Sequence, residues 1–469
     1  MEIANGVGLW AVLLVAVAGG IGWGIRGCYG GAPGATLPGA LIALTICLLS
    51  GRPDWQQASL YIAAVTACGL AYGGFMSHVK LAHFSRSASH LNAAYGLGAL
   101  FFVTSLWGGI GGGALGLVLG GWSPWAIIIL AAGMVITARI AYYLLIDLIG
   151  IRLTPPRDER WARTFGAFLC MAVVCVVRRE GAGLVGLTYG YMGWGFGFLV
   201  GMFIQLLEIR AFGHYSFNWW RAMEVTIGLA GGAALAIGVL PLAQRLPELP
   251  RLPAPWVALG AYFTLWFIVL LHVRTNLRHY KLNGLLLEGR WAHRTALWLA
   301  DVTSVALAVV IGVILAAWHF WGPVDPRVGV QASLLGLAGM CVFLVSALDF
   351  GTAKDKRPGM KDKRPRIATA WWFVPPYILL IVGTLAMPAA FALPSVHAIG
   401  VADFWKYGIP LAVVLVIVLS KISSSLWDHD PPQAHRRFGP GADNDVYGSI
   451  PPPKPYEEPK PRSGAGSLG

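Results

Sequence analysis

Apolar runs of about twenty residues recur along almost the whole chain, and no other feature constrains the fold as strongly. A run of that length spans a bilayer as a helix, because a helix satisfies its own backbone hydrogen bonds. Thirteen such segments are visible, near 7–24, 36–50, 56–77, 93–119, 124–148, 165–177, 182–207, 222–244, 255–273, 296–320, 330–349, 369–393 and 405–426. The sequence therefore predicts an all-α fold, a polytopic transmembrane helix bundle of about 13 spans.

Positive charges between these segments predict the orientation. If all thirteen segments span, the connections on one side hold 21 Lys and Arg residues and those on the other side hold 7. The richer side faces the cytoplasm. We therefore expect a multi-pass protein of a cell inner membrane, with the N-terminus outside and the C-terminus in the cytoplasm. The segments 36–50 and 165–177 are short, and the alternative is that they are re-entrant.

The composition excludes several classes of function. The net charge of +13 lies between apolar runs, where it meets anionic lipid headgroups, so membrane lipids rather than nucleic acid are the expected partners. The six cysteines form no C-x-x-C pair, and His78, His83 and His90 share one loop without a carboxylate or thiol. We therefore predict no metal site and no cofactor.

Two stretches of the chain are similar to later stretches. GLAYGGFMS at 69–77 resembles GLTYGYMGW at 186–194, and LWGGIGGGALGLVLG at 106–120 resembles TIGLAGGAALAIGVL at 226–240, with offsets of 117 and 120 residues. Equal order and nearly equal spacing indicate an internal duplication of four spans each. An even number of spans preserves orientation, so the repeats would be parallel.

Three regions follow from this pattern. Residues 1–244 form a Gly-rich transmembrane bundle of two repeats, about 1–121 and 122–244. Residues 255–426 form five further transmembrane helices, expected at the periphery and as the surface for a second copy or a partner subunit. Residues 427–469 include PPPKPYEEPKPRSGAGSLG and are expected to be a disordered Pro-rich cytoplasmic tail, with a docking segment as the alternative.

The first candidate site is the stretch GGIGWGIRGCYGGAPGA, which combines eight glycines with Arg26. The glycines Gly24, Gly27, Gly30 and Gly31 would form a backbone nest that turns N–H groups towards an anion. The guanidinium of Arg26 would add bidentate binding. We expect Arg26 to point into the protein, while the alternative is an interfacial anchor that reaches lipid headgroups.

The second candidate site is NWWRAMEVTIG, residues 218–228. Arg221 and Glu224 are three positions apart and lie on one helix face, so a helix-start ion pair is one interpretation. The other is a polar site inside the bundle, because intramembrane carboxylates are usually functional. A buried Arg26 needs a counter-charge, for which Glu224 is the first choice and Asp301 the second.

The sequence GWGIRGCYGGAPGA, together with FNWWRAMEVTIG at 217–228, resembles an uncharacterised family of polytopic bacterial inner-membrane proteins with a G-W-G-I-R-G motif. The resemblance implies a membrane fold and no known activity. In that family a His-Glu pair follows the arginine, whereas this chain has Gly31 and Ala32 there. The departure argues against a proton relay in this loop.

Parallel repeats, Gly-interrupted helices and a few buried charges are typical of secondary transporters. We therefore predict a transporter-like or channel-like protein for a small solute, with a bias towards an anion because of Arg26 and Arg221. A membrane-embedded enzyme acting on a lipid-linked substrate, with Glu224 and Asp301 as its carboxylates, is one alternative. A structural subunit of a membrane complex is the other. No catalytic residue is assigned, since no ATP site or nucleophile elbow occurs.

Overall fold

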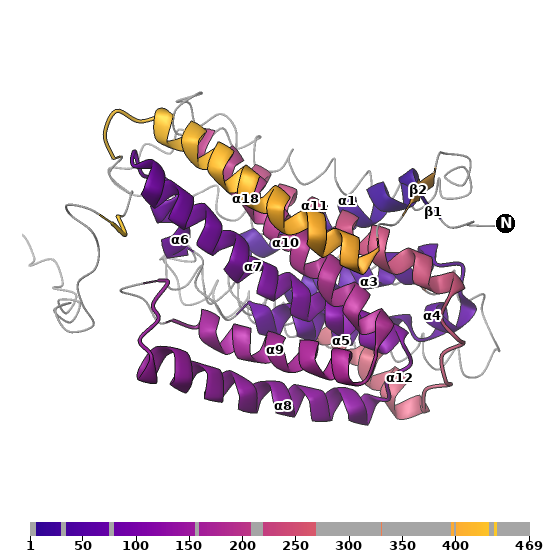
Figure 1. Cartoon of the computed structure of the whole chain (residues 1–469). Helices are drawn as coiled ribbons and strands as arrows, with labels where there is room; N and C mark the ends of the chain where they lie inside the picture. Colours follow the sequence, from indigo (N-terminus) through magenta and orange to yellow (C-terminus); the bar gives the residue numbers. More distant parts are fainter. Residues whose placement is uncertain are drawn as a thin grey trace, which may run out of the picture.

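A computed structural model of the chain describes residues 6–29, 34–74, 79–154, 159–207, 219–268, 330, 395–397, 400–430 and 436–438 (Figure 1). The described residues are almost entirely helical, which confirms the predicted all-α class. The helices are α1 Leu9–Tyr29, α3 Thr36–Leu49, α4 Pro53–Gln57, α5 Ser59–Gly73, α6 Val79–Phe84, α7 His90–Leu119, α8 Pro124–Tyr142, η1 Tyr143–Leu148, α9 Trp161–Val177, α10 Gly181–Leu207, α11 Trp219–Val239, η3 Leu240–Gln244, α12 Ala254–Ala261, η4 Tyr262–Phe267 and α18 Val401–Ser425. Two short strands, β1 Gly6–Gly8 and β2 Ser395–His397, pair antiparallel.

Helices occupy ten of the predicted apolar segments, while 296–320, 330–349 and 369–393 lie outside the described residues apart from Val330. By length and composition, five helical stretches are long and apolar enough to cross a membrane, namely His90–Leu119, Pro124–Leu148, Gly181–Leu206, Ala222–Gln244 and Val401–Ser425. Such a bundle is compatible with an integral membrane protein. The two segments flagged as short form α3, with 14 residues, and α9, with 17.

Six helices pack around one another in a closed order. α1 packs on α3, α3 on α5, α5 on α7, α7 on α10, α10 on α11, and α11 returns to α1. α3 is buried along its whole length, which explains how a helix of 14 residues lies inside the bundle without a polar face. This six-helix ring holds the centre of the molecule and the polar side chains considered below.

Glycine allows these helices to approach at backbone distance. A methyl group on Gly228 of α11 would collide with the carbonyl of Gly19 of α1, and one on Gly112 of α7 would collide with the carbonyl of Gly186 of α10. Membrane helices gain close van der Waals contact where small residues face each other. The glycines of the predicted Gly-rich bundle therefore lie at two of its helix crossings.

The contacts of α5 on α7 have a local counterpart in those of α10 on α11. Gly69 lies against Gly111, and Gly193 lies against Gly231. The two positions on α7 and α11 differ by 120 residues, the offset found in the sequence, whereas the two glycines on α5 and α10 differ by 124 rather than 117. The structural register on α10 is thus two helical turns from the one that the sequence match indicates.

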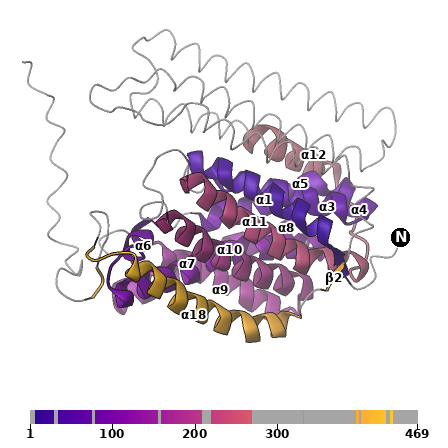
Figure 2. The ribbon, with the colours of Figure 1, turned by 90° about the horizontal axis from the view of Figure 1, so that it is seen from above.

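The periphery consists of α8 and α18, which lie along opposite edges of the bundle in Figure 1. Only 17% of the most apolar window of α8 and 22% of that of α18 are buried, against 94% for α7. α12 lies at the edge opposite α18 in Figure 2. α8 belongs to the predicted Gly-rich bundle of residues 1–244 and is nevertheless largely exposed.

Arg52 and Asp54 form an ion pair and several hydrogen bonds at the end of the bundle that the charge count places outside. The Arg52 Nη2 lies 2.6 Å from Asp54 Oδ2, and the same guanidinium donates to the carbonyls of Ala243, Leu246 and Pro247. The Leu249 N–H donates to Asp54 at 2.7 Å. Partial burial raises the pKa of Asp54, but these hydrogen bonds lower it by more, so the net pKa is below its ordinary value.

The first residues of the predicted disordered tail pack on the opposite end of the bundle. Asp430 accepts hydrogen bonds from the Ser87 hydroxyl at 2.9 Å and the Ala88 N–H at 2.6 Å. The Asn92 amide oxygen accepts from the N–H groups of Arg437 and Phe438 at 2.6 and 2.8 Å. These contacts correct the predicted start of the tail at Trp427, and residues 439–469 lie outside the described residues.

Candidate functional site

Arg26 and Glu224 form a buried ion pair inside the bundle. The Arg26 Nη1 lies 3.2 Å from Oε1 and 3.3 Å from Oε2 of Glu224. The residues are 4% and 1% exposed, so neither side chain reaches solvent or the molecular surface to any useful extent. The predicted inward direction of Arg26 and its pairing with Glu224 are confirmed, and the anchor that reaches lipid headgroups is excluded in this conformation.

The backbone around Arg26 differs from the expected nest. α1 continues as a helix to Tyr29, so Gly24 and Gly27 lie within a helix whose N–H groups point along its axis. Positive φ values among described glycines occur at Gly51, Gly121 and Gly150, away from this site. The predicted nest is therefore wrong for Gly24 and Gly27. Both lie inside α1, where the helix directs their N–H groups along its axis and not towards a ligand. Gly30 and Gly31 lie outside the described residues.

Aromatic rings enclose the guanidinium. The Arg26 Cζ lies 5.2 Å from the ring centroid of Trp23 and 5.0 Å from that of Trp107, both within cation–π range. Trp23 also contacts Trp194, at 5.7 Å between centroids, and Phe198, at 5.9 Å. Since these rings come from α1, α7 and α10, the cluster fills the middle of the six-helix ring.

Three donors in this cluster have no hydrogen-bond partner among the described residues. They are the Arg26 Nε and the indole N–H groups of Trp23 and Trp194, all of them buried. A buried donor without a partner costs roughly 1–3 kcal/mol. Glu224 accepts hydrogen bonds from Nη1 of Arg26 but not from Nε. Among the described residues the site therefore has more donors than acceptors, and an additional acceptor could bind there.

A second polar contact lies at the same end of the bundle. The Arg86 Nη2 donates to the Gln205 side-chain oxygen at 3.1 Å, and both residues are buried. Arg86 precedes α7, Gln205 is near the end of α10, Arg26 is near the end of α1, and Glu224 is near the start of α11. All four ends belong to the side that the charge count assigns to the cytoplasm.

The remaining sequence candidates are not placed at this site. Arg221 lies in the first turn of α11, but its side chain lies outside the described part, and Asp301 does so entirely. The tryptophans were missed as site residues. Their signal in the sequence is a tryptophan beside glycine in GIGWGIRG, SLWGGIG and YMGWGFG. The glycines that lie against these side chains belong to other helices, with Gly228 against Trp23, Gly73 against Trp107 and Gly231 against Trp194.

Comparisons with known proteins give no assignment. No family model, curated protein or solved structure matches the chain. The function must therefore be inferred from the cluster itself. Its chemistry is that of a cation held between indole rings, a carboxylate that covers part of it, and unused N–H donors. Such a cluster is suited to binding an oxyanion.

Proposed function

We propose that the protein is a multi-pass inner-membrane transporter-like or channel-like protein for a small anionic solute, and that Arg26 is its anion-binding group. The observation that supports this is the buried Arg26–Glu224 pair with unused donors beside it. A carboxylate or phosphate would accept hydrogen bonds from Arg26 Nε and from an indole N–H. The planar guanidinium suits such a ligand because its donors match the geometry of an oxyanion.

Glu224 acts in this proposal as the resident counter-ion. It occupies one end of the guanidinium when no solute is bound, because a buried unpaired cation is strongly destabilising. A solute oxyanion competes with Glu224 for Arg26 and releases it. The conformation with the pair closed is then an occluded state, with the tryptophan rings separating the ion pair from the other end of the bundle.

The topology of the site is part of the same proposal. We propose that about 13 spans are present, that the N-terminus is outside, and that residues 1–121 and 122–244 are parallel repeats. Local support is the correspondence between Gly69–Gly111 and Gly193–Gly231. Transporters of this kind place the substrate between repeats near helix interruptions. Here Arg26 comes from the first proposed repeat and Glu224 from the second.

Thermal unfolding of the purified protein in detergent tests anion binding. Acetate or inorganic phosphate should raise the unfolding temperature of the wild type, and chloride at the same ionic strength should raise it less. Arg26→Gln should remove the difference between the anions, since the fork-shaped donor is gone. Arg139→Gln, which removes an exposed arginine from α8, is the matched control and should retain it. Equal stabilisation of Arg26→Gln by acetate would refute the assignment.

A further inference from the structure

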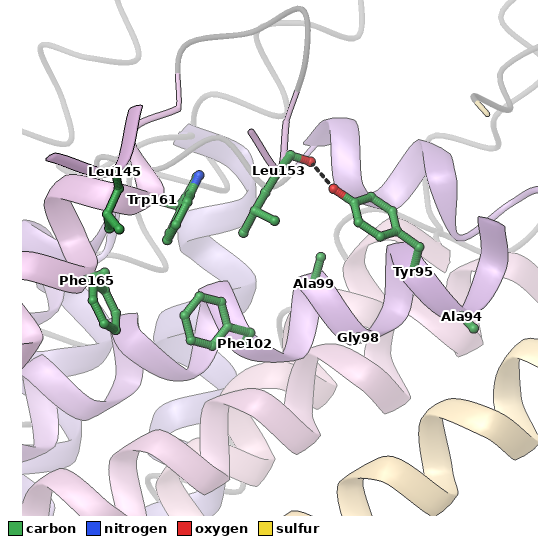
Figure 3. Close-up of a pocket in the computed structure, with 9 residues that line it drawn as sticks. All are labelled: Ala94, Tyr95, Gly98, Ala99, Phe102, Leu145, Leu153, Trp161 and Phe165. Atoms are coloured by element: carbon green, nitrogen blue, oxygen red, sulfur yellow. Dashed lines mark hydrogen bonds between the residues drawn. The ribbon is translucent and has the colours of Figure 1, made fainter. Parts of the chain in front are cut away.

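A groove of about 560 Å³ lies between α7, η1 and α9 and is separate from the Arg26 site (Figure 3). Phe102, Leu145, Trp161 and Phe165 line one part of it, and Tyr95 lies towards the other end in Figure 3. Its volume is within the range of about 300–1,000 Å³ that is common for ligand pockets. The Tyr95 hydroxyl at one end donates its hydrogen bond to the Leu153 carbonyl at 2.8 Å, so this donor already has a partner within the protein. The groove therefore offers an apolar surface for an apolar ligand.

The helices that form the groove also carry exposed apolar side chains. On η1, Leu144 is 42% exposed and Leu148 is 65% exposed, and on α9 Leu169 is 48% exposed. A surface of this kind faces hydrocarbon in a membrane protein. η1 is a π-helix, a form frequent at functional sites. A ligand in the groove would thus be in contact with the acyl chains of the bilayer.

Arginines are found near Tyr95 and Leu153, at one end of the groove. Arg152 and Arg160 are exposed and directly precede the lining residues Leu153 and Trp161 in the sequence. The Arg437 Nη2 donates to the Arg152 carbonyl at 3.1 Å, and its Cζ lies 5.9 Å from the Tyr95 ring centroid. The guanidinium of Arg437 therefore lies at the Tyr95 end of the groove, and the exposed Arg152 and Arg160 adjoin two lining residues in the sequence.

The carboxylate of Glu159, next to Arg160, is turned inward. Glu159 is fully buried, and its oxygens accept from the N–H groups of Leu153 and Thr154, at 2.8 and 2.9 Å, and from the Trp161 indole at 2.8 Å. Its charge is thus held inside the loop by backbone and indole donors. Among the described residues near this end, Arg152 and Arg160 are exposed, as is Asp147 on η1.

We propose that this groove binds one anionic phospholipid, with an acyl chain along Phe102, Leu145 and Phe165 and the phosphate at Arg152 and Arg160. An amphipathic occupant is required, because a purely apolar groove ends at a basic mouth. The charge count places this mouth on the cytoplasmic side, where anionic lipids attract basic residues. The inference is independent of the Arg26 site and of the transported solute.

Native mass spectrometry of the full-length protein with added phosphatidylglycerol or phosphatidylcholine tests the inference. The wild type should retain one tightly bound phosphatidylglycerol in preference to phosphatidylcholine. The double variant Arg152→Gln/Arg160→Gln should weaken the phosphatidylglycerol complex by about fivefold for each arginine. Its matched control is Arg178→Gln/Arg179→Gln, which removes two exposed arginines at the other end of α9 and should bind as the wild type does.

A second pair of variants tests the groove itself. Ala99 points into the groove in Figure 3, so Ala99→Phe should fill it and reduce the binding of both lipids. Ala132→Phe, on the exposed side of α8, is the control. Wild-type lipid retention in Ala99→Phe, or equal losses in both arginine pairs, would overturn the proposal in favour of unspecific annular lipid. Inorganic phosphate should not displace the lipid, and displacement would instead indicate a free-phosphate site.

Discussion

Arg26 and Glu224 are separated by 198 residues in the chain, and the Arg26 Nη1 nevertheless lies 3.2 Å from Glu224 Oε1. The contact joins α1 to α11, which close the six-helix ring. A carboxyl group can take up a proton when its partner is lost, but a guanidinium remains charged under all ordinary conditions. Removing Arg26 therefore leaves a carboxyl group that can become neutral, whereas removing Glu224 leaves a permanent positive charge.

Removal of either partner should destabilise the protein, by about 3–5 kcal/mol for a fully buried pair. Glu224→Gln should be worse than Arg26→Gln, because it leaves the permanent cation of Arg26 buried without this counter-ion, in a cluster with two indole donors that have no partner among the described residues. The double variant should unfold at a higher temperature than Glu224→Gln alone. Thermal unfolding in one detergent checks the order. Additive losses in the double variant would contradict a direct pair.

The glycines at helix crossings should not accept side chains. Gly112→Val should collide with the backbone of Gly186 and should destabilise the protein by about 1–3 kcal/mol. Gly181→Ala is the control, since no atom lies within 4 Å of the added methyl group and alanine favours a helix by up to about 1 kcal/mol. Unfolding temperatures of the two variants decide. A tolerant Gly112→Val would mean that α7 and α10 are further apart.

The Arg52–Asp54 contact should make the stability sensitive to acid. Because hydrogen bonds lower the pKa of Asp54 below its ordinary value of 3.8, the folded state gains stability above that value and loses it as the pH falls below it. Asp54→Asn should be less stable near neutral pH and should lose less on acidification. The unfolding temperature measured from about pH 6 to about pH 2 gives both slopes.

Asn92 should control the segment that follows α18. Its side chain makes three hydrogen bonds with Arg437 and Phe438, at 2.6, 2.8 and 3.2 Å. Asn92→Ala removes them, so trypsin should cleave after Arg436 and Arg437 faster than in the wild type. Ser424→Ala, whose hydroxyl bonds only within its own helix turn to Lys421, is the control. An unchanged cleavage rate in Asn92→Ala would show that other contacts hold the segment.

The sequence predicted the helices well because their apolar runs are long and because charged residues separate them. It also predicted the Arg26–Glu224 pair, since a buried arginine requires an opposite charge on the same side of the membrane. That argument needs only topology and charge. Topology and charge do not determine which residues of α5 and α10 correspond in the two proposed repeats. Glycine recurs every few residues in these helices, so several alignments look similar.

Other features depend on packing that one sequence does not reveal. In the sequence, Trp107 and Trp194 cannot be distinguished from other apolar residues of α7 and α10. Only the packing of these helices shows that both rings contact Trp23. The glycines near Arg26 suggested a turn, but α1 continues as a helix to Tyr29, and Gly19 and Gly22 of the same helix pack closely on Gly228 and Pro38. Asp430 and Asn92 stabilise part of a Pro-rich tail through contacts across more than 340 positions of the chain.

The central claim is that Arg26 binds a small anion on its way through the protein. Uptake of radiolabelled acetate into proteoliposomes, at equal amounts of inserted protein, tests it most directly. The wild type should take up acetate above empty liposomes, Arg139→Gln should match it, and Arg26→Lys should lose uptake while inserting normally, because lysine keeps the charge but lacks the planar fork. Acetate uptake by Arg26→Lys at the wild-type rate would contradict the account.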